Sequence, residues 1–99
     1  MSAAIGIDVG ARRVGVAAAD PSGTIATPLR TLDRNRPGFW TELSRACVER
    51  DCALMVVGLP RRLDGSEGEA AQGARRFAAE VTRRLGVEVA LWDERLTTA

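Results

Sequence analysis

Two apolar segments of strand length open the sequence, at residues 3–9 and 13–20, and a short turn at residues 10–13 joins them. After a Pro-Ser-Gly turn signal, a third segment of the same kind runs over residues 24–31. Consecutive strands with short connections tend to be neighbours in a sheet, so the sequence predicts a three-stranded meander at its N-terminus.

The rest of the sequence alternates helical and strand patterns. Apolar residues at helical spacing predict a helix over residues 37–51, and a short strand at 53–57 follows and breaks at the Gly-Leu-Pro of 58–60. A capping-box pattern formed by Ser66 and Glu69 predicts the start of a second helix. That helix stops at a glycine, and a fifth strand follows at residues 87–92.

The predicted order of elements is β-β-β-α-β-α-β. A meander followed by crossover units predicts an α/β domain, with a mixed sheet and helices on its faces, and this pattern suits the ribonuclease H-like fold. We expect one small domain over residues 1–99, because a chain of this length supports a single core. One face of the first two strands carries small residues that would let a helix approach closely.

A carboxylate interrupts the small-residue face of the first strand. Asp8 lies in an apolar run, where an unpaired charge would be costly unless a cation or hydrogen-bond donors compensate it. Asp8 is therefore a candidate to hold a metal ion or a metal-bound phosphate. The alternative is an aspartate at a frayed strand end that opens a hairpin beside Gly10, and the pattern alone does not decide between them.

The composition narrows the chemistry. The chain of 99 residues carries a formal net charge of +1, has no histidine, and contains only two cysteines. A zinc site and a nucleophile activated by histidine are therefore excluded or nearly so. No apolar run approaches the roughly 20 residues of a membrane span, and the N-terminus does not resemble a signal peptide. We expect a cytoplasmic protein with no membrane partner.

Three groups of residues follow one another in a characteristic order and spacing: Gly6–Gly10 with Arg13–Ala17, Val56–Pro60 with Asp64-Gly65, and Trp92–Thr98. Together they resemble the YqgF (RuvX) family over nearly the whole chain. The resemblance implies a ribonuclease H-fold protein from a family described as Holliday-junction resolvases and as nucleases that mature the 5′ end of 16S ribosomal RNA. It therefore implies a hydrolase that acts on nucleic acid, either an rRNA precursor in ribosome biogenesis or branched DNA.

Such a family implies carboxylates that hold metal. Two Mg²⁺ or Mn²⁺ ions activate a water and stabilise a leaving oxygen without histidine, and hard cations prefer carboxylate oxygens. We predict Asp8, Glu94 and Asp93 as catalytic residues, with Asp8 and Glu94 as the metal ligands, because Glu94 reaches further than Asp93. In the usual strand order of this fold, the fourth strand separates Asp8 from Glu94 by roughly 9–10 Å. As alternatives, Asp93 caps a helix and Glu94 complements a helix dipole.

Substrate contacts are predicted from arginines on the first turn, beside Asp8, and from arginines that precede the second helix, whose N-terminus attracts anions. Solvated surface arginines are the alternative, since the near-neutral net charge gives no broad electrostatic footprint for nucleic acid. The predicted substrate-binding residues are Gly10, Arg12, Arg13, Arg61, Arg62 and Arg95.

The family pattern continues past the end of this sequence. In the family, the Asp-Glu-Arg motif is followed by a helix with another acidic residue, whereas this chain stops at Ala99. We therefore expect a family member without its C-terminal part, which binds metal weakly and has little nuclease activity by itself. An uncovered sheet face also predicts a homodimer or a swapped oligomer that exchanges residues 96–99. Arg61 is a smaller departure, because many members carry an apolar residue there.

Three functions remain open from the sequence. The first is a metal-dependent nuclease, with RNA and branched DNA undecided as substrates. The second is a non-catalytic module that binds nucleic acid or the ribosome. The third is actin-like phosphotransfer, in which the same Asp-containing hairpin holds the Mg²⁺ and phosphates of a nucleotide, although the chain is short for the two lobes that this requires.

Overall fold

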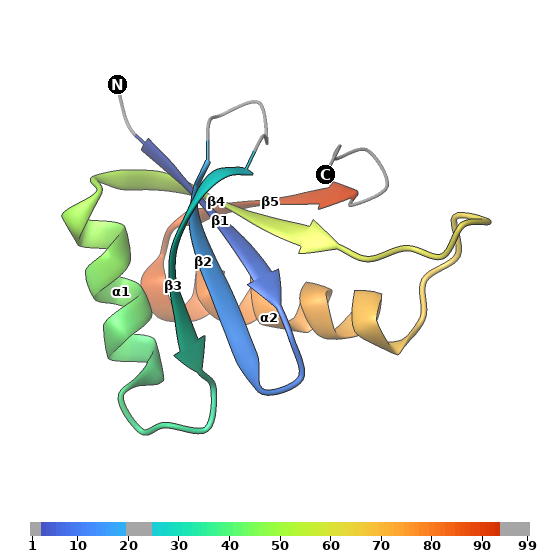
Figure 1. The fold of residues 1–99 in the computed structure, drawn as a ribbon, viewed down its shortest axis with the longest axis horizontal. Helices are drawn as coiled ribbons and strands as arrows, with labels where there is room; N and C mark the ends of the chain where they lie inside the picture. The colour runs from blue at the N-terminus through green and yellow to red at the C-terminus, as the bar shows by residue number, and fades with distance from the viewer. Residues whose placement is uncertain (1–2, 20–24, 94–99) are drawn as a thin grey trace.

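The chain forms a mixed sheet flanked by helices (Figure 1). The computed structural model describes residues 3–19 and 25–93. No helix within those ranges is long and apolar enough to cross a membrane. The elements are β1 (Ala3–Val9), β2 (Arg13–Ala19), β3 (Ile25–Asp33), α1 (Phe39–Glu49), β4 (Cys52–Leu59), α2 (Glu69–Leu85) and β5 (Glu88–Asp93).

The strands lie in the order β3-β2-β1-β4-β5. β2 pairs antiparallel with both β1 and β3, so the predicted meander is confirmed. β4 pairs parallel with β1, and β5 pairs parallel with β4. The α/β class and the order of elements are therefore confirmed, and β4 separates β1 from β5 as expected. The C-terminal ends of β1, β4 and β5 consequently meet at one edge of the sheet.

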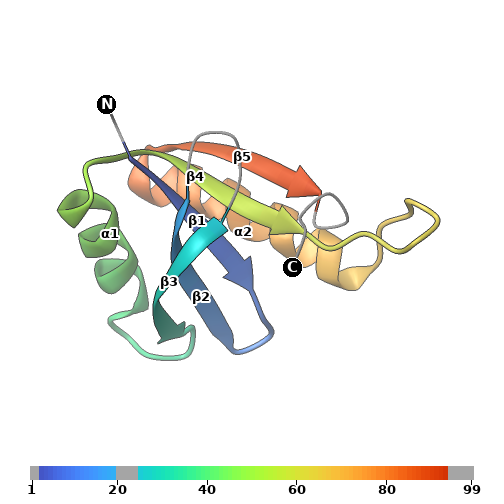
Figure 2. The same cartoon turned by 45° about the horizontal axis from the view of Figure 1, so that its top comes forward.

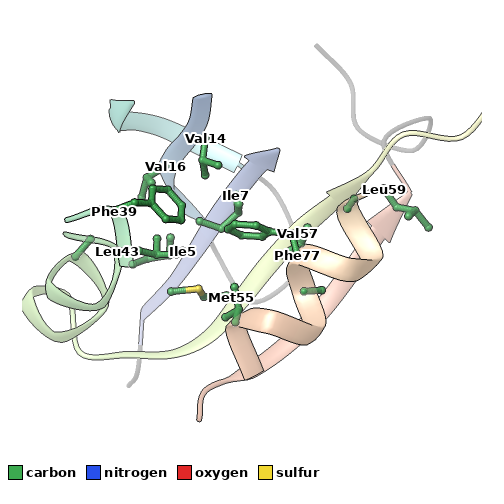
Figure 3. Packing of buried hydrophobic residues seen from close by; sticks show 14 of the residues in the cluster. Ile5, Ile7, Val14, Val16, Phe39, Leu43, Met55, Val57, Leu59 and Phe77 are labelled. Atoms are coloured by element: carbon green, nitrogen blue, oxygen red, sulfur yellow. The ribbon is translucent and has the colours of Figure 1, made fainter. Parts of the chain in front are cut away.

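Both helices pack against one face of the sheet (Figure 2). Phe39 and Leu43 of α1 and Phe77 of α2 share a buried cluster with Ile5 and Ile7 of β1. Figure 3 shows these side chains gathered between the helices and the sheet. The described helices thus pack on the face that carries large branched side chains. Packing on that face buries more apolar area than packing on the small-residue face. The expectation that a helix covers the small-residue face is not met by α1 or α2.

Two local predictions are wrong. β4 continues through Gly58, because this residue still pairs with β5. Ser66 does not cap α2: the N-cap is Gly68, and Ser66 donates its N–H and its hydroxyl to Asp64 at 2.8 and 2.6 Å. A polar side chain caps a helix only if the preceding loop places that side chain at the first turn of the helix. Here Ser66 turns back toward Asp64, two residues before the N-cap. Gly86 ends α2 as predicted, with a left-handed φ of 66°.

Candidate active site

Asp8 lies near the C-terminal end of β1 with an exposed side chain. It pairs with Gly15 of β2 and follows the Ile7–Val57 pair, so it also adjoins β4. α1 and α2 cover the opposite face of the sheet, so they do not enclose the Asp8 carboxylate. Within the described residues the side chain of Asp8 makes no hydrogen bond or ion pair. Both of its oxygens are therefore open to a cation.

A hollow of about 340 Å³ adjoins Asp8. Gly15 and Ala17 of β2 and Thr31 of β3 contribute to its lining. A Cβ at Gly15 would lie 3.6 Å from the Asp8 Cβ, so any side chain longer than a methyl group would begin to crowd the carboxylate. The small residues of this face therefore leave room beside Asp8 for a ligand.

Asp93 ends β5 at the same edge of the sheet, but on the other face. It pairs with Leu59, a member of the buried cluster, and only 14% of its side chain is exposed. Its carboxylate lies 3.9 Å from the Arg61 guanidinium. The structure therefore brings Asp8 and Asp93 to one edge without bringing their carboxylates to one face. The other predicted residues of this motif, Glu94 and Arg95, lie outside the described residues.

The described residues supply one candidate metal ligand. No group of three or more His, Cys, Asp or Glu side chains within residues 3–19 and 25–93 is placed to hold a metal ion. An exposed carboxylate with open space beside it fits a hard divalent cation, so Asp8 suits the role on chemical grounds. The second ligand, Glu94, stays a prediction.

Arg61 belongs to an ion-pair network on the loop between β4 and α2. Its guanidinium lies 3.3 Å from Glu67, and Glu67 accepts two further hydrogen bonds of 2.7 Å from Arg75. The hydrogen bonds from Arg75, together with the charges of both arginines, hold the pKa of Glu67 below its usual value. Since Asp93 lies on its other side, Arg61 has its charge compensated within the protein. Its contact with substrate stays a prediction.

Arg62 is held inside the same loop. Its Nη1 donates to the Ser66 hydroxyl at 3.3 Å, and its backbone N–H donates to the Ser66 carbonyl at 2.9 Å. The N–H of Gly65, at a φ of 89°, donates to the Arg62 carbonyl at 2.8 Å and closes the turn. The Asp64-Gly65 motif therefore fixes the shape of this loop, and a phosphate contact by Arg62 stays a prediction.

The β1–β2 turn depends on a glycine. The N–H of Gly10 donates to the Arg13 carbonyl at 2.9 Å, and a Cβ on Gly10 would lie only 2.7 Å from that same oxygen. Backbone atoms cannot move aside cheaply, so a side chain here would open the turn. Gly10 thus has a structural role beside Asp8, while its contact with substrate stays a prediction.

Gly10→Ala is expected to lower the free energy of unfolding by about 1–3 kcal/mol, because the added methyl group overpacks the turn. Urea denaturation followed by circular dichroism measures this. Gly73→Ala is the matched control, since Gly73 lies inside α2 and a Cβ there would meet only the Arg76 Nη2 at 3.9 Å. It should leave stability unchanged or raise it by up to about 1 kcal/mol. Equal losses in both variants would contradict the role assigned to Gly10.

The pairing of β2 with β3 brings a second loop against this turn. Arg34 donates its backbone N–H to the Arg12 carbonyl at 2.8 Å and its side chain to the Gly10 carbonyl at 2.9 Å. Arg12 in turn lies 3.4 Å from Asp33. A hydrogen bond from the Asn35 N–H, followed by the charge and hydrogen bond of Arg12, holds the pKa of Asp33 below its usual value. The two loops therefore form one bonded unit.

Arg34 and Arg36 are site candidates that the sequence motifs did not indicate. The predicted third strand ended at residue 31, so the pairing that places residue 33 opposite Arg13 became known only from the structure.

Comparison with known proteins identifies the family. Residues 2–99 match the sequence profile described as "RuvX: Holliday junction resolvase". The chain belongs to the RuvX family. It is 44% identical over 98% of its length to a protein of Ruegeria pomeroyi, and 42% identical over 95% to one of Lachnospira eligens, both named "Putative pre-16S rRNA nuclease". The resemblance inferred from the motifs is confirmed. The chain spans 64% and 70% of these two relatives.

Solved structures share the fold of this RuvX chain at low identity. Pelota from Archaeoglobus fulgidus matches with a TM-score of 0.54 at 12% identity, over 98% of this chain and 27% of that one. A Listeria monocytogenes protein described as a putative N-acetylmannosamine kinase matches with a TM-score of 0.52 at 17% identity, over 92% of this chain and 35% of that one. These similarities concern the fold alone.

Proposed function

We propose that this RuvX chain is the nuclease part of a divalent-metal-dependent enzyme that hydrolyses phosphodiester bonds in structured nucleic acid. The observation that carries the proposal is the exposed Asp8 near the C-terminal end of β1, whose side chain has no described partner and borders a hollow over β2 and β3. The names of the curated relatives support a 16S rRNA precursor as the substrate, and the family description supports a Holliday junction as the alternative. The cytoplasm is the proposed location.

Asp8 and Glu94 are the proposed metal ligands, with Mg²⁺ or Mn²⁺ as the ion. Bound there, the ion would activate water and stabilise the leaving oxygen. Asp93 is the weaker candidate, since Arg61 engages its carboxylate on the other face of the sheet.

The remaining residues position the substrate. Gly15 keeps the approach to Asp8 open, and the turn closed by Gly10 presents Arg13 next to it. A guanidinium at that place binds and orients a phosphate of the strand, because its planar fork matches phosphate oxygens. A homodimer or a swapped oligomer is also proposed for this chain, and light scattering tests it by measuring the molar mass in solution.

The test is a side-by-side cleavage assay on a pre-16S rRNA fragment and a four-way DNA junction, with Mg²⁺, Mn²⁺ or EDTA. It uses a version of the protein extended to the length of its relatives, because the 99-residue chain is expected to have little activity by itself. The proposal predicts cleavage of at least one substrate with either metal and none in EDTA. Binding without cleavage would instead support a non-catalytic ribosome-associated module. Affinity for ATP without nuclease activity would favour phosphotransfer.

A further inference from the structure

Four arginines gather at one end of the sheet. Arg12 and Arg13 belong to the β1–β2 turn, and Arg34 and Arg36 lie in the loop after β3. Residues 10–13 and 33–36 together hold these four arginines and one aspartate, which gives them a local net charge of +3 against +1 for the whole chain. We call these four residues the arginine cluster. The fold thus concentrates a positive charge that the composition does not reveal.

Two members of the arginine cluster are engaged within the protein. Arg12 pairs with Asp33, as described above. Arg34 is fixed by its hydrogen bond to the turn, and its guanidinium also lies 5.5 Å from the centre of the Phe77 ring. These two arginines hold the cluster together, so they contribute charge without being free to reach a ligand.

The other two members, Arg13 and Arg36, have unoccupied guanidinium groups. Among the described residues neither group makes a hydrogen bond or an ion pair, apart from a longer-range attraction of Arg36 to Asp33. Both arginines line one hollow of about 680 Å³, whose wall continues to Gly38 and Phe39 at the start of α1. No side chain caps α1, so its N-terminal N–H groups add positive potential at the same place.

The carboxylates that line this hollow do not cancel its charge. Asp33 is paired with Arg12. Glu42 lies 3.8 Å from Arg30 and 3.8 Å from Arg45. The negative charges of Asp33 and Glu42 are therefore balanced by arginines other than Arg13 and Arg36. An anion that enters the hollow meets Arg13 and Arg36.

Arg13 connects this hollow with the strand face that carries Asp8. Arg13 is two residues from Gly15 along β2, and Gly15 pairs directly with Asp8. Side chains two residues apart in a strand share a face and are about 7 Å apart, so Arg13 begins on the face of Asp8. A strand that places one phosphate at Asp8 therefore has a neighbouring phosphate within reach of Arg13, and from Arg13 the hollow continues toward the start of α1.

We propose that the arginine cluster binds the sugar-phosphate backbone of the substrate strand, with Arg13 contacting a phosphate next to the one cleaved at Asp8 and Arg36 contacting a phosphate further along the strand. This inference rests on the proposed nuclease function. Contacts to phosphate fix the position and register of a nucleic acid without selecting its sequence. The site therefore assigns to Arg36 a positioning role that the sequence motifs of the family do not indicate.

The test measures equilibrium binding to a pre-16S rRNA fragment in EDTA. Fluorescence anisotropy reports the binding at salt concentrations of about 50 to 200 mM. Arg13→Ala and Arg36→Ala should each weaken binding about fivefold to tenfold near 0.1 M salt. Each should also reduce the slope of log K against log salt by about 0.7, the value for one phosphate contact on a single strand. A fragment of unrelated sequence should show the same losses.

Arg50→Ala is the matched control, because it removes the same charge from an exposed position at the opposite end of α1. It should leave affinity and slope unchanged, and circular dichroism checks that all variants fold. Unchanged binding by both Arg13→Ala and Arg36→Ala would overturn the proposal, and so would an equal loss in Arg50→Ala. If both variants bind normally but metal-dependent cleavage is observed, the proposed phosphate contacts are wrong and the proposed nuclease function is still supported. An unaltered protein that neither binds nor cleaves nucleic acid would overturn the nuclease function itself.

Discussion

Asp8→Asn is expected to reduce metal-dependent cleavage about a thousandfold, because a bound metal supplies several kcal/mol of transition-state stabilisation and an amide is a poor ligand for it. Stability should stay within about 0.5 kcal/mol of the unaltered protein, since Asp8 is exposed and no described residue bonds to it. Single-turnover cleavage and urea denaturation in EDTA measure the two effects separately.

Asp51→Asn is the matched control for Asp8→Asn. Asp51 is exposed after α1 and has a φ of 49°, a conformation that asparagine also tolerates. The same change of charge there should alter neither cleavage nor stability. A clear loss of stability in metal-free Asp8→Asn would make Asp8 a structural hydrogen-bond acceptor. Full cleavage by that variant would remove Asp8 from the site.

Phe77→Ala is expected to lower the free energy of unfolding by about 3–5 kcal/mol, which is a large share of the 5–15 kcal/mol typical of a domain. Phe77 is 4% exposed, and its ring lies 6.1 Å from that of Phe39 and 5.5 Å from that of Trp40. Truncation leaves a cavity between α1, α2 and the sheet. Urea denaturation monitored by tryptophan fluorescence and circular dichroism measures the loss.

Two further variants bracket the Phe77 result. Phe77→Leu keeps most of the apolar volume and should cost about 1.5 kcal/mol or less. Val48→Ala removes apolar atoms from a side chain that is 76% exposed, and should stay within about 0.5 kcal/mol. A loss below 1 kcal/mol in Phe77→Ala would show that α2 is held by other contacts.

The sequence predicted those parts of the fold that depend on neighbouring residues. The strands, the first turn and the stop of α2 at Gly86 follow from local periodicity and glycine placement. The sequence left the environment of Asp8 open, because its exposure depends on which face of the sheet the helices cover. That choice is settled by packing across the sheet, where Ile5 and Ile7 offer more area than the residues around Asp8.

The site was predictable to the extent that a motif marks it. Asp8 stands out in the sequence, whereas Asp93 and Arg61 reveal their pairing only through strand alternation and the path of the β4–α2 loop. Arg36 lies in no motif and becomes a candidate only once the register of β2 and β3 is known. The contacts of Arg36 and of the Asp93–Arg61 pair depend on distant segments and escaped the sequence, whereas the wrong cap at Ser66 was a local error.

The contact between Arg34 and Phe77 ties the arginine cluster to the core, because Arg34 also holds the Gly10 carbonyl of the turn. The proposed binding of a nucleic-acid strand to the arginine cluster is therefore thermodynamically linked to the packing of α2 against the sheet. A strand that binds only the folded form raises the melting temperature by mass action. By reciprocity, a strand that binds more tightly while α2 is docked stabilises that docking by the same coupling free energy.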